Sequence, residues 1–246
     1  MNKIVVGILP NSEECTYESY YDDYNKFIAL YPKRIYECGA IPFGILMNDG
    51  NVDYVALEMC DAFLIPGGKR VNRYVYETIY YALKHNKPLL GICLGSQAIA
   101  IFSAINERLD KDKEYATDEV ISIYQSLKSE YDGTLLSKLP DGNMHNLVDI
   151  TRDNVRNHIH DIEIDENSIL YSIVNSKKLS VVSLHNYDYK YVGKGFKVTA
   201  YSSDGVKEAI EYDNKDYFIV GVHFHPEIME DNRFFERLIE EARKRK

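Results

Sequence analysis

The stretch Pro88-Leu89-Leu90-Gly91-Ile92-Cys93-Leu94-Gly95-Ser96-Gln97-Ala98-Ile99-Ala100 decides how this chain must fold. It opens with a short apolar run that is typical of a buried strand. The residues from Ser96 to position 104 are small or apolar and predict a helix. A cysteine between two glycines, Gly-x-Cys-x-Gly, joins these two elements. The pattern predicts a sharp strand-to-helix turn that holds Cys93 in a strained conformation, a nucleophile elbow with cysteine in place of serine.

Two interpretations of Cys93 follow from this local pattern. The flanking Gly91 and Gly95 allow neighbouring chain segments to approach closely, as such a turn requires. A sulfur at a helix N-terminus lies beside partial positive charge, which favours the thiolate that acts as a nucleophile. A cysteine in a strand-turn-helix can equally be a buried structural residue. The local pattern alone leaves both interpretations open.

Length and composition restrict the class of protein. The 246 residues allow one large α/β domain or two small ones, and 45% hydrophobic with 27% charged residues is ordinary for a globular protein. The net charge of −9 argues against nucleic acid or an anionic membrane as partner. The sequence holds no apolar run of membrane-spanning length, and its first apolar run is too short for a signal peptide. Four scattered cysteines fit a reducing compartment, so we expect a cytoplasmic protein.

The first half of the chain alternates between strand and helix patterns. Apolar runs predict strands at residues 3–10, 39–46, 61–65 and 88–92. Apolar residues at helical spacing predict helices at 17–36, with Pro32 interrupting it, and at 52–59 and 71–85. This alternation predicts an α/β fold with a parallel sheet, whose functional groups gather beyond the C-terminal strand ends. Pro66-Gly67-Gly68 and Cys93 both occupy such ends.

The second half mixes a polar segment with strand patterns. Residues 106–142 are rich in charge and predict an insertion with a helix at 117–129, either a lid, an interaction surface or a solvated helix. Residues 162–171 and 179–184 have a β-rich pattern, and the Asp204-Gly205 turn predicts a hairpin between 198–202 and 208–212. Residues 218–224 form a last apolar strand. Asp231 or Asn232 can cap a closing helix.

The segment His225-Pro226-Glu227 supplies what a cysteine nucleophile needs. A base must take the thiol proton, and a further group must orient that base. In an extended segment, residues two apart point to the same side, so Glu227 can reach the His225 ring and fix its tautomer. His223 could act as the base instead, but it lies within the strand and we interpret it as a packing residue.

An oxyanion formed during attack on a carbonyl needs hydrogen-bond donors. The peptide N–H of Leu94, directly after the nucleophile, is one candidate. The Gly67-Gly68 corner at the end of the third strand is placed to supply the second.

These motifs together resemble a known family. Pro-Gly-Gly, Gly-x-Cys-x-Gly-x-Gln and His-Pro-Glu, in that order, are similar to the class I glutamine amidotransferase superfamily, whose triad is Cys-His-Glu. Its flavodoxin-like, mostly parallel sheet is then the expected architecture. The second half contains Ser183-Leu184-His185, the segment 195–200, Asp204-Gly205-Val206 and Glu208-Ala209-Ile210-Glu211. That succession resembles the γ-glutamyl-γ-aminobutyrate hydrolase branch, the peptidase C26-like group. The resemblance covers most of residues 1–246, interpreted as a single domain, except about 105–157.

The resemblance implies hydrolysis of a small γ-glutamyl amide through a thioester on Cys93. It implies that the amides of Gly68 and Leu94 hold the oxyanion and that His225, oriented by Glu227, protonates the leaving amine. Further residues correspond to positions on the substrate side: Gly67, Gln97, Ser183, Leu184 and His185.

Three departures from the family pattern concern the side where the leaving amine would bind. Lys69-Arg70-Val71 replaces an Asp-Val pair, Ser103-Ala104 replaces a Gly-Gly, and His185-Asn186-Tyr187 replaces His-His-Gln. The catalytic groups are intact. The chemistry is therefore retained in this interpretation, and the identity of the amine is left open.

Histidines near the middle of the chain give only weak support for a metal site. His145, His158 and His160, with Asp153 and Asp161 nearby, contain a His-x-His pair without a cysteine companion. A Cys-His-Glu mechanism needs no metal, so we expect neither a metal nor a cofactor.

Two other functions compete with the hydrolase. One is a glutaminase subunit that delivers ammonia to a synthase partner. The other is a catalytically idle protein that binds a γ-glutamyl metabolite or another protein. Association into a homodimer is left open.

Overall fold

The computed structural model describes residues 3–11, 25–48, 50–145, 151, 153–229 and 231–246. Within them a nine-stranded sheet has the order β2-β1-β5-β6-β13-β12-β11-β8-β9. Its strands are β1 Val5–Ile8, β2 Ile41–Gly44, β5 Ala62–Ile65, β6 Leu89–Ile92, β8 Ile159–Ile164, β9 Lys178–Val182, β11 Phe196–Ser202, β12 Lys207–Tyr212 and β13 Ile219–Val222. Two short pairs lie outside it: β3 Met47–Asn48 with β4 Asn51–Val52, and β7 Leu136–Lys138 with β10 Tyr187–Tyr189.

The sheet has a parallel half and an antiparallel half. Strands β2, β1, β5, β6 and β13 run parallel, whereas β12, β11, β8 and β9 add on by antiparallel pairing. Every residue of β5, β6 and β13 is buried, as expected for parallel strands covered on both faces. The predicted α/β class with a parallel sheet in its first half is confirmed, and so is the hairpin of β11 and β12 around Gly205.

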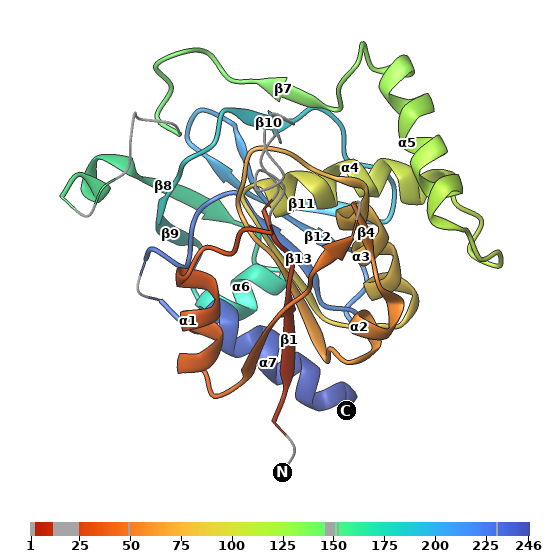
Figure 1. Ribbon diagram of the computed structural model, residues 1–246. Coiled ribbons are helices and arrows are strands. Elements are labelled where there is room, and N and C mark those ends of the chain that lie inside the picture. The colour runs from red at the N-terminus through yellow and green to blue at the C-terminus, as the bar shows by residue number, and fades with distance from the viewer. Residues whose placement is uncertain (1–2, 12–24, 49, 146–150, 152, 230) are drawn as a thin grey trace, which may run out of the picture.

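Helices cover both faces of this sheet (Figure 1). On one face, α3 Arg73–Lys84 and α4 Leu94–Arg108 pack on the strands, and α5 Thr117–Glu130 packs outside them. On the other face lie α1 Leu30–Glu37, α6 Ile169–Val174 and α7 Arg233–Arg245. The short helix α2 Tyr54–Glu58 joins the core of the first face through Leu57. None of the helices formed by the described residues has the length and apolar character that crossing a bilayer requires.

The segment 106–142 is not simply a solvated surface. Its helix α5 buries Val120 and Leu127 against α3 and α4, and the rings of Tyr76 and Tyr124 lie 4.9 Å apart. The chain then forms β7, which pairs with β10, the strand that follows the loop at residues 183–186. The segment thereby returns to the chain that follows β9.

Two predicted elements are wrong in extent. The helix expected at 17–36 begins only at Leu30 in the described part, and Pro32 lies in its first turn, where proline is tolerated. Residues 17–24 of that prediction lie outside the described residues. The β-rich pattern at 162–171 ends at Ile164, and α6 follows because Ser168 caps it, accepting from the N–H of Tyr171 at 2.8 Å.

Candidate active site

Three neighbouring parallel strands bring the predicted catalytic segments together. β6 lies between β5 and β13, and parallel strands place their C-terminal ends at one edge of the sheet. β5 ends in the Gly67-Gly68 corner, β6 ends in Cys93, and β13 leads to His225. Segments more than a hundred residues apart in sequence therefore meet at one point.

Cys93 adopts the strained turn that the glycines predict. Its φ of 51° and ψ of −102° lie in a region that residues with side chains rarely adopt. Its N–H donates to the Val222 carbonyl at 2.8 Å, so the sheet itself holds the turn. A Cβ at Gly95 would lie 2.3 Å from the Ile65 carbonyl oxygen, so only glycine fits against β5 at that position.

The histidine and glutamate form a buried pair. His225 Nδ1 donates to Glu227 Oε1 at 2.6 Å, and both side chains are almost fully buried. Burial opposes the imidazolium, but the charges of Glu227 and Cys93 outweigh it and raise the pKa of His225 well above its usual range. His225 Nε2 is buried without a hydrogen-bond partner among the described residues, which leaves this nitrogen available to a reacting group.

The geometry of this pair differs from the expected extended segment. Residues 226–229 form a turn, and the Ile228 N–H donates to the His225 carbonyl at 3.1 Å. Arg34 Nε, from α1, donates to the Glu227 carbonyl at 3.0 Å and fixes the end of the turn. A turn, rather than strand alternation, therefore brings the carboxylate to the ring.

The glycine corner lies directly against the nucleophile and the imidazole. A Cβ at Gly67 would lie 3.0 Å from His225 Cε1 and 3.3 Å from Cys93 Cβ. One at Gly68 would lie 3.1 Å from Leu94 Cδ2, so the two predicted oxyanion donors are neighbours. Leu94 is the first residue of α4, where peptide N–H groups have no partner within the helix.

Tyr31 is a site residue that the sequence did not indicate. Its hydroxyl accepts a hydrogen bond of 3.0 Å from the Gly67 N–H, which leaves Gly68 as the donor of the corner. Burial, and next the negative charge of Glu227, raise the pKa of Tyr31 well above its usual range. The helical spacing in the sequence shows only that Tyr31 faces the core, not that its hydroxyl reaches β5.

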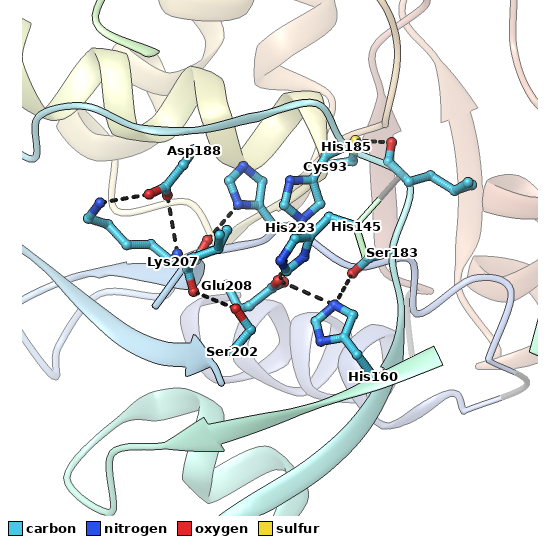
Figure 2. Close-up of polar contacts among 12 residues, drawn as sticks. Cys93, His145, His160, Ser183, His185, Asp188, Ser202, Lys207, Glu208 and His223 are labelled. Carbon is cyan, nitrogen blue, oxygen red and sulfur yellow. Dashed lines mark hydrogen bonds and ion pairs between the residues drawn. The ribbon is translucent and has the colours of Figure 1, made fainter. Parts of the chain in front are cut away.

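The predicted substrate-side residues occupy different surroundings. Gln97 lies one turn after Cys93 on α4 and is buried. The Leu184 carbonyl lies 3.8 Å from Cys93 Sγ, whereas the side chains of Ser183 and His185 are buried and turn toward a group of histidines (Figure 2). A role for these residues in substrate binding stays a prediction.

This group, called here the histidine cluster, consists of His145, His160, His185, His223 and Glu208. Burial lowers the pKa of His160, and it lowers that of His223 well below the usual range. Burial opposes the carboxylate of Glu208, but its close contacts with His145 and His185 outweigh burial, and the pKa of Glu208 is lowered. His158, which the sequence pairs with His160, is not among the donor groups that the described residues form.

Comparison with known proteins gives one family match and several relatives. The family model of Peptidase C26 matches residues 71–227. The glutamine amidotransferase-like protein RP404 of Rickettsia prowazekii is 24% identical, over 94% of this chain and 93% of its own length. The CTP synthase of Thermosipho africanus is 29% identical over 70% of this chain, which corresponds to only 32% of that enzyme.

Solved structures share the fold. The glutaminase domain of Trypanosoma brucei CTPS, solved with acivicin, superposes with a TM-score of 0.66 at 18% identity, covering 98% of this chain and 94% of that one. A GMP synthase subunit from Thermoplasma acidophilum gives 0.62 at 14% identity, covering 99% and 96%. At these identities the likeness concerns the fold alone.

Proposed function

This chain belongs to the Peptidase C26 family, and from that premise we propose that it hydrolyses the γ-glutamyl amide bond of a small γ-glutamyl compound and releases glutamate. The single observation that supports this most is the arrangement around Cys93. A strained cysteine at the start of α4 lies beside a buried His225–Glu227 pair, at a corner made of two glycines.

The first half-reaction transfers the γ-glutamyl group to sulfur. The thiol proton of Cys93 passes to His225 Nε2, and the sulfur attacks the γ-carbonyl carbon of the substrate. The amides of Gly68 and Leu94 donate to the oxyanion of the tetrahedral intermediate. The C–N bond then breaks, His225 gives its proton to the departing amine, and a thioester remains.

The second half-reaction releases glutamate. A water molecule gives a proton to His225 Nε2 and attacks the thioester carbon. The C–S bond breaks, and the proton returns from His225 to the Cys93 thiolate. Glu227 keeps the imidazole in one tautomer in both halves and favours its protonated form.

The charge beside the glycine corner bears on the leaving amine. Lys69 and Arg70 are exposed and directly follow Gly68. Two cationic side chains at this place favour an amine that carries a carboxylate, as in γ-glutamyl-γ-aminobutyrate, over a cationic amine.

One experiment tests the proposal. The purified protein is incubated with γ-glutamyl amines of different charge and, separately, with a γ-glutamyl electrophile, and released glutamate and covalent labelling are measured. We expect turnover and stoichiometric labelling of Cys93, and loss of turnover by about 10⁴-fold or more in Cys93→Ala with an unchanged circular dichroism spectrum. Retained turnover in that variant, or specific binding without labelling, would contradict the proposal.

A glutaminase subunit is the second candidate, favoured by the similarity to part of the CTP synthase of Thermosipho africanus. In that case γ-glutamyl amines would be poor substrates. Glutamine hydrolysis would be weak in the isolated protein and would rise only when a synthase partner is added.

A further inference from the structure

The histidine cluster brings together side chains from distant parts of the chain. His160 is on β8, Glu208 on β12, and His185 follows β9, while His145 follows the segment 106–142. Among the donors, His145, His185 and Glu208 have side chains with no exposed surface, and that of His160 is 7% exposed. Figure 2 shows these side chains directed toward one another.

The rings of His145 and His185 are held by their outer nitrogens. His145 Nε2 lies 3.1 Å and 3.3 Å from the two carboxylate oxygens of Asp204, and His185 Nδ1 lies 3.0 Å from the Tyr187 carbonyl oxygen. Carboxylates and carbonyls only accept hydrogen bonds, so each of these nitrogens is a donor. In a neutral ring the opposite nitrogen then carries a lone pair. This outer-shell arrangement is typical of metal-binding histidines.

The inner nitrogens meet at one carboxylate oxygen. His145 Nδ1, His160 Nε2 and His185 Nε2 lie 3.0, 3.4 and 3.5 Å from Glu208 Oε1. Both carboxylate oxygens, His145 Nδ1 and His185 Nε2 are buried and make no hydrogen bond of acceptable geometry to the described residues. Lone pairs that face a carboxylate repel it. Glu208 and Asp204 outweigh burial and raise the pKa of His145, but protonating the other buried rings as well carries a large desolvation cost. A cation among these atoms would satisfy them, and at His160 Nε2 it would take the place of the Ser183 hydroxyl, which lies 2.8 Å from that nitrogen.

The spacing fits a small divalent ion. Zinc–nitrogen and zinc–oxygen bonds of about 2.0–2.1 Å in tetrahedral geometry separate ligand atoms by about 3.3–3.4 Å. The rings of His145 and His160 stand at 77° with centroids 4.6 Å apart, so their in-plane lone pairs can converge. The rings of His185 and His223 are stacked at 16° and cannot both point at one ion.

We propose that His145 Nδ1, His160 Nε2 and Glu208 bind a first-row divalent cation of the Zn²⁺ class, with His185 Nε2 as the nearest further donor. Two histidines and one carboxylate are a donor set that such ions accept. The proposal departs from the sequence-based expectation of no metal, and it does not depend on the proposed function.

The role of this ion is structural. It would join His145, which follows the segment 106–142, to β8 and β12. The His145 carbonyl accepts a hydrogen bond from the His185 N–H at 2.9 Å. The preceding Leu184 contacts Cys93 Sγ, so the ion would fix the loop beside the nucleophile. Binding that joins distant segments stabilises the folded state, because the unfolded chain lacks a preformed site.

The test uses untagged full-length protein, stripped with a chelator and titrated with Co²⁺ and Zn²⁺. We expect stoichiometric binding of Co²⁺ with visible d–d bands of a low-coordinate site, displacement by Zn²⁺, and a Tm raised by several degrees with excess Zn²⁺. The Cys93→Ala protein should give the same spectrum, which excludes the catalytic thiol as a ligand. Absence of d–d bands and of any change in Tm in the wild-type protein would overturn the proposal.

Matched variants locate the site. Loss of an outer-shell partner typically weakens metal binding by about 10–100-fold. His160→Gln removes a proposed ligand and should therefore weaken binding by more than that. Asp204→Asn, which changes the outer partner of His145 and no proposed ligand, should weaken binding by about 10–100-fold and keeps the test valid if the first variant does not fold. His85→Gln, on an exposed histidine, should bind as the wild type does. Equal affinities in the Asp204 and His85 variants would overturn the assignment.

Discussion

The His225–Glu227 pair and the histidine cluster both combine imidazoles with a buried carboxylate, but they are built differently. In the pair, one ring nitrogen binds the carboxylate at 2.6 Å and the other is left for Cys93. In the cluster, the outer nitrogens of two rings are held by oxygen acceptors, and the inner nitrogens face Glu208. In the proposed mechanism the carboxylate orients a ring for proton transfer, whereas in the proposed ion site it completes a set of donors. The orientation of the imidazole rings toward the carboxylate, more than the residue types, distinguishes the His225–Glu227 pair from the histidine cluster.

The largest expected effect concerns the carboxylate of the pair. In Glu227→Gln the amide no longer fixes the tautomer of His225 or stabilises its charge, and we expect turnover of a γ-glutamyl amide to fall by about 10²–10⁴-fold. Steady-state glutamate release measures this. Glu240→Gln, at an exposed position of α7, is the control and should keep wild-type turnover. Wild-type turnover in Glu227→Gln would contradict a role of the His225–Glu227 pair in catalysis.

Tyr31 should affect catalysis more moderately. Tyr31→Phe removes the acceptor of the Gly67 N–H and disturbs the corner that presents Gly68, so kcat should fall by about 10-fold. Tyr36→Phe, at a residue 71% exposed in the same helix, is the control. If kcat is unchanged and only the free energy of unfolding falls, Tyr31 supports the fold and not the corner.

The pH dependence of stability distinguishes the pair from an uncharged contact. The pKa of His225 is raised in the folded protein. Its ion pair with Glu227 therefore stabilises the folded protein fully at pH values below the pKa of histidine in the unfolded chain, about 6.5. This contribution is lost as the pH rises through the raised folded pKa. The difference in unfolding free energy between the wild type and Glu227→Gln should therefore be largest near pH 6 and shrink at alkaline pH. Denaturant titrations at several pH values measure it, and a difference that grows with pH would contradict this account.

A Ser183 variant tests whether this residue belongs to the histidine cluster or to the predicted substrate side. Its hydroxyl lies 2.8 Å from His160 Nε2 and its side chain is buried, so Ser183→Ala should lower the free energy of unfolding of the metal-stripped protein by about 1 kcal/mol. Denaturant unfolding measures this smallest effect. An unchanged stability with a raised KM would instead assign Ser183 to the substrate side.

The contact between His225 and Glu227 could be predicted because the two residues are local in sequence. His225 and Glu227 are two residues apart, and the glycines around Cys93 report a turn that a Cβ would prevent. The parallel strands that bring them together follow from continuous apolar runs. Short-range patterns thus determine most of this site.

The cluster could not be assembled from the sequence. His160 and Glu208 are on β8 and β12, which are not direct neighbours, since β11 lies between them. Their approach depends on the register of three antiparallel strands, and no periodicity in the sequence encodes which loop histidine joins them. For the same reason the sequence grouped His145 and His160 with His158, a near neighbour, and did not indicate Glu208 or His185 as their companions.

The end of β13 carries residues of both regions. His223 stacks on His185 of the cluster with ring centroids 4.1 Å apart, and His225, two positions later, is the imidazole beside Cys93. Deletion or insertion of a single residue just before His223 would therefore displace both histidines at once. A change in chain length at that point would alter both regions, whereas a substitution can alter either one alone.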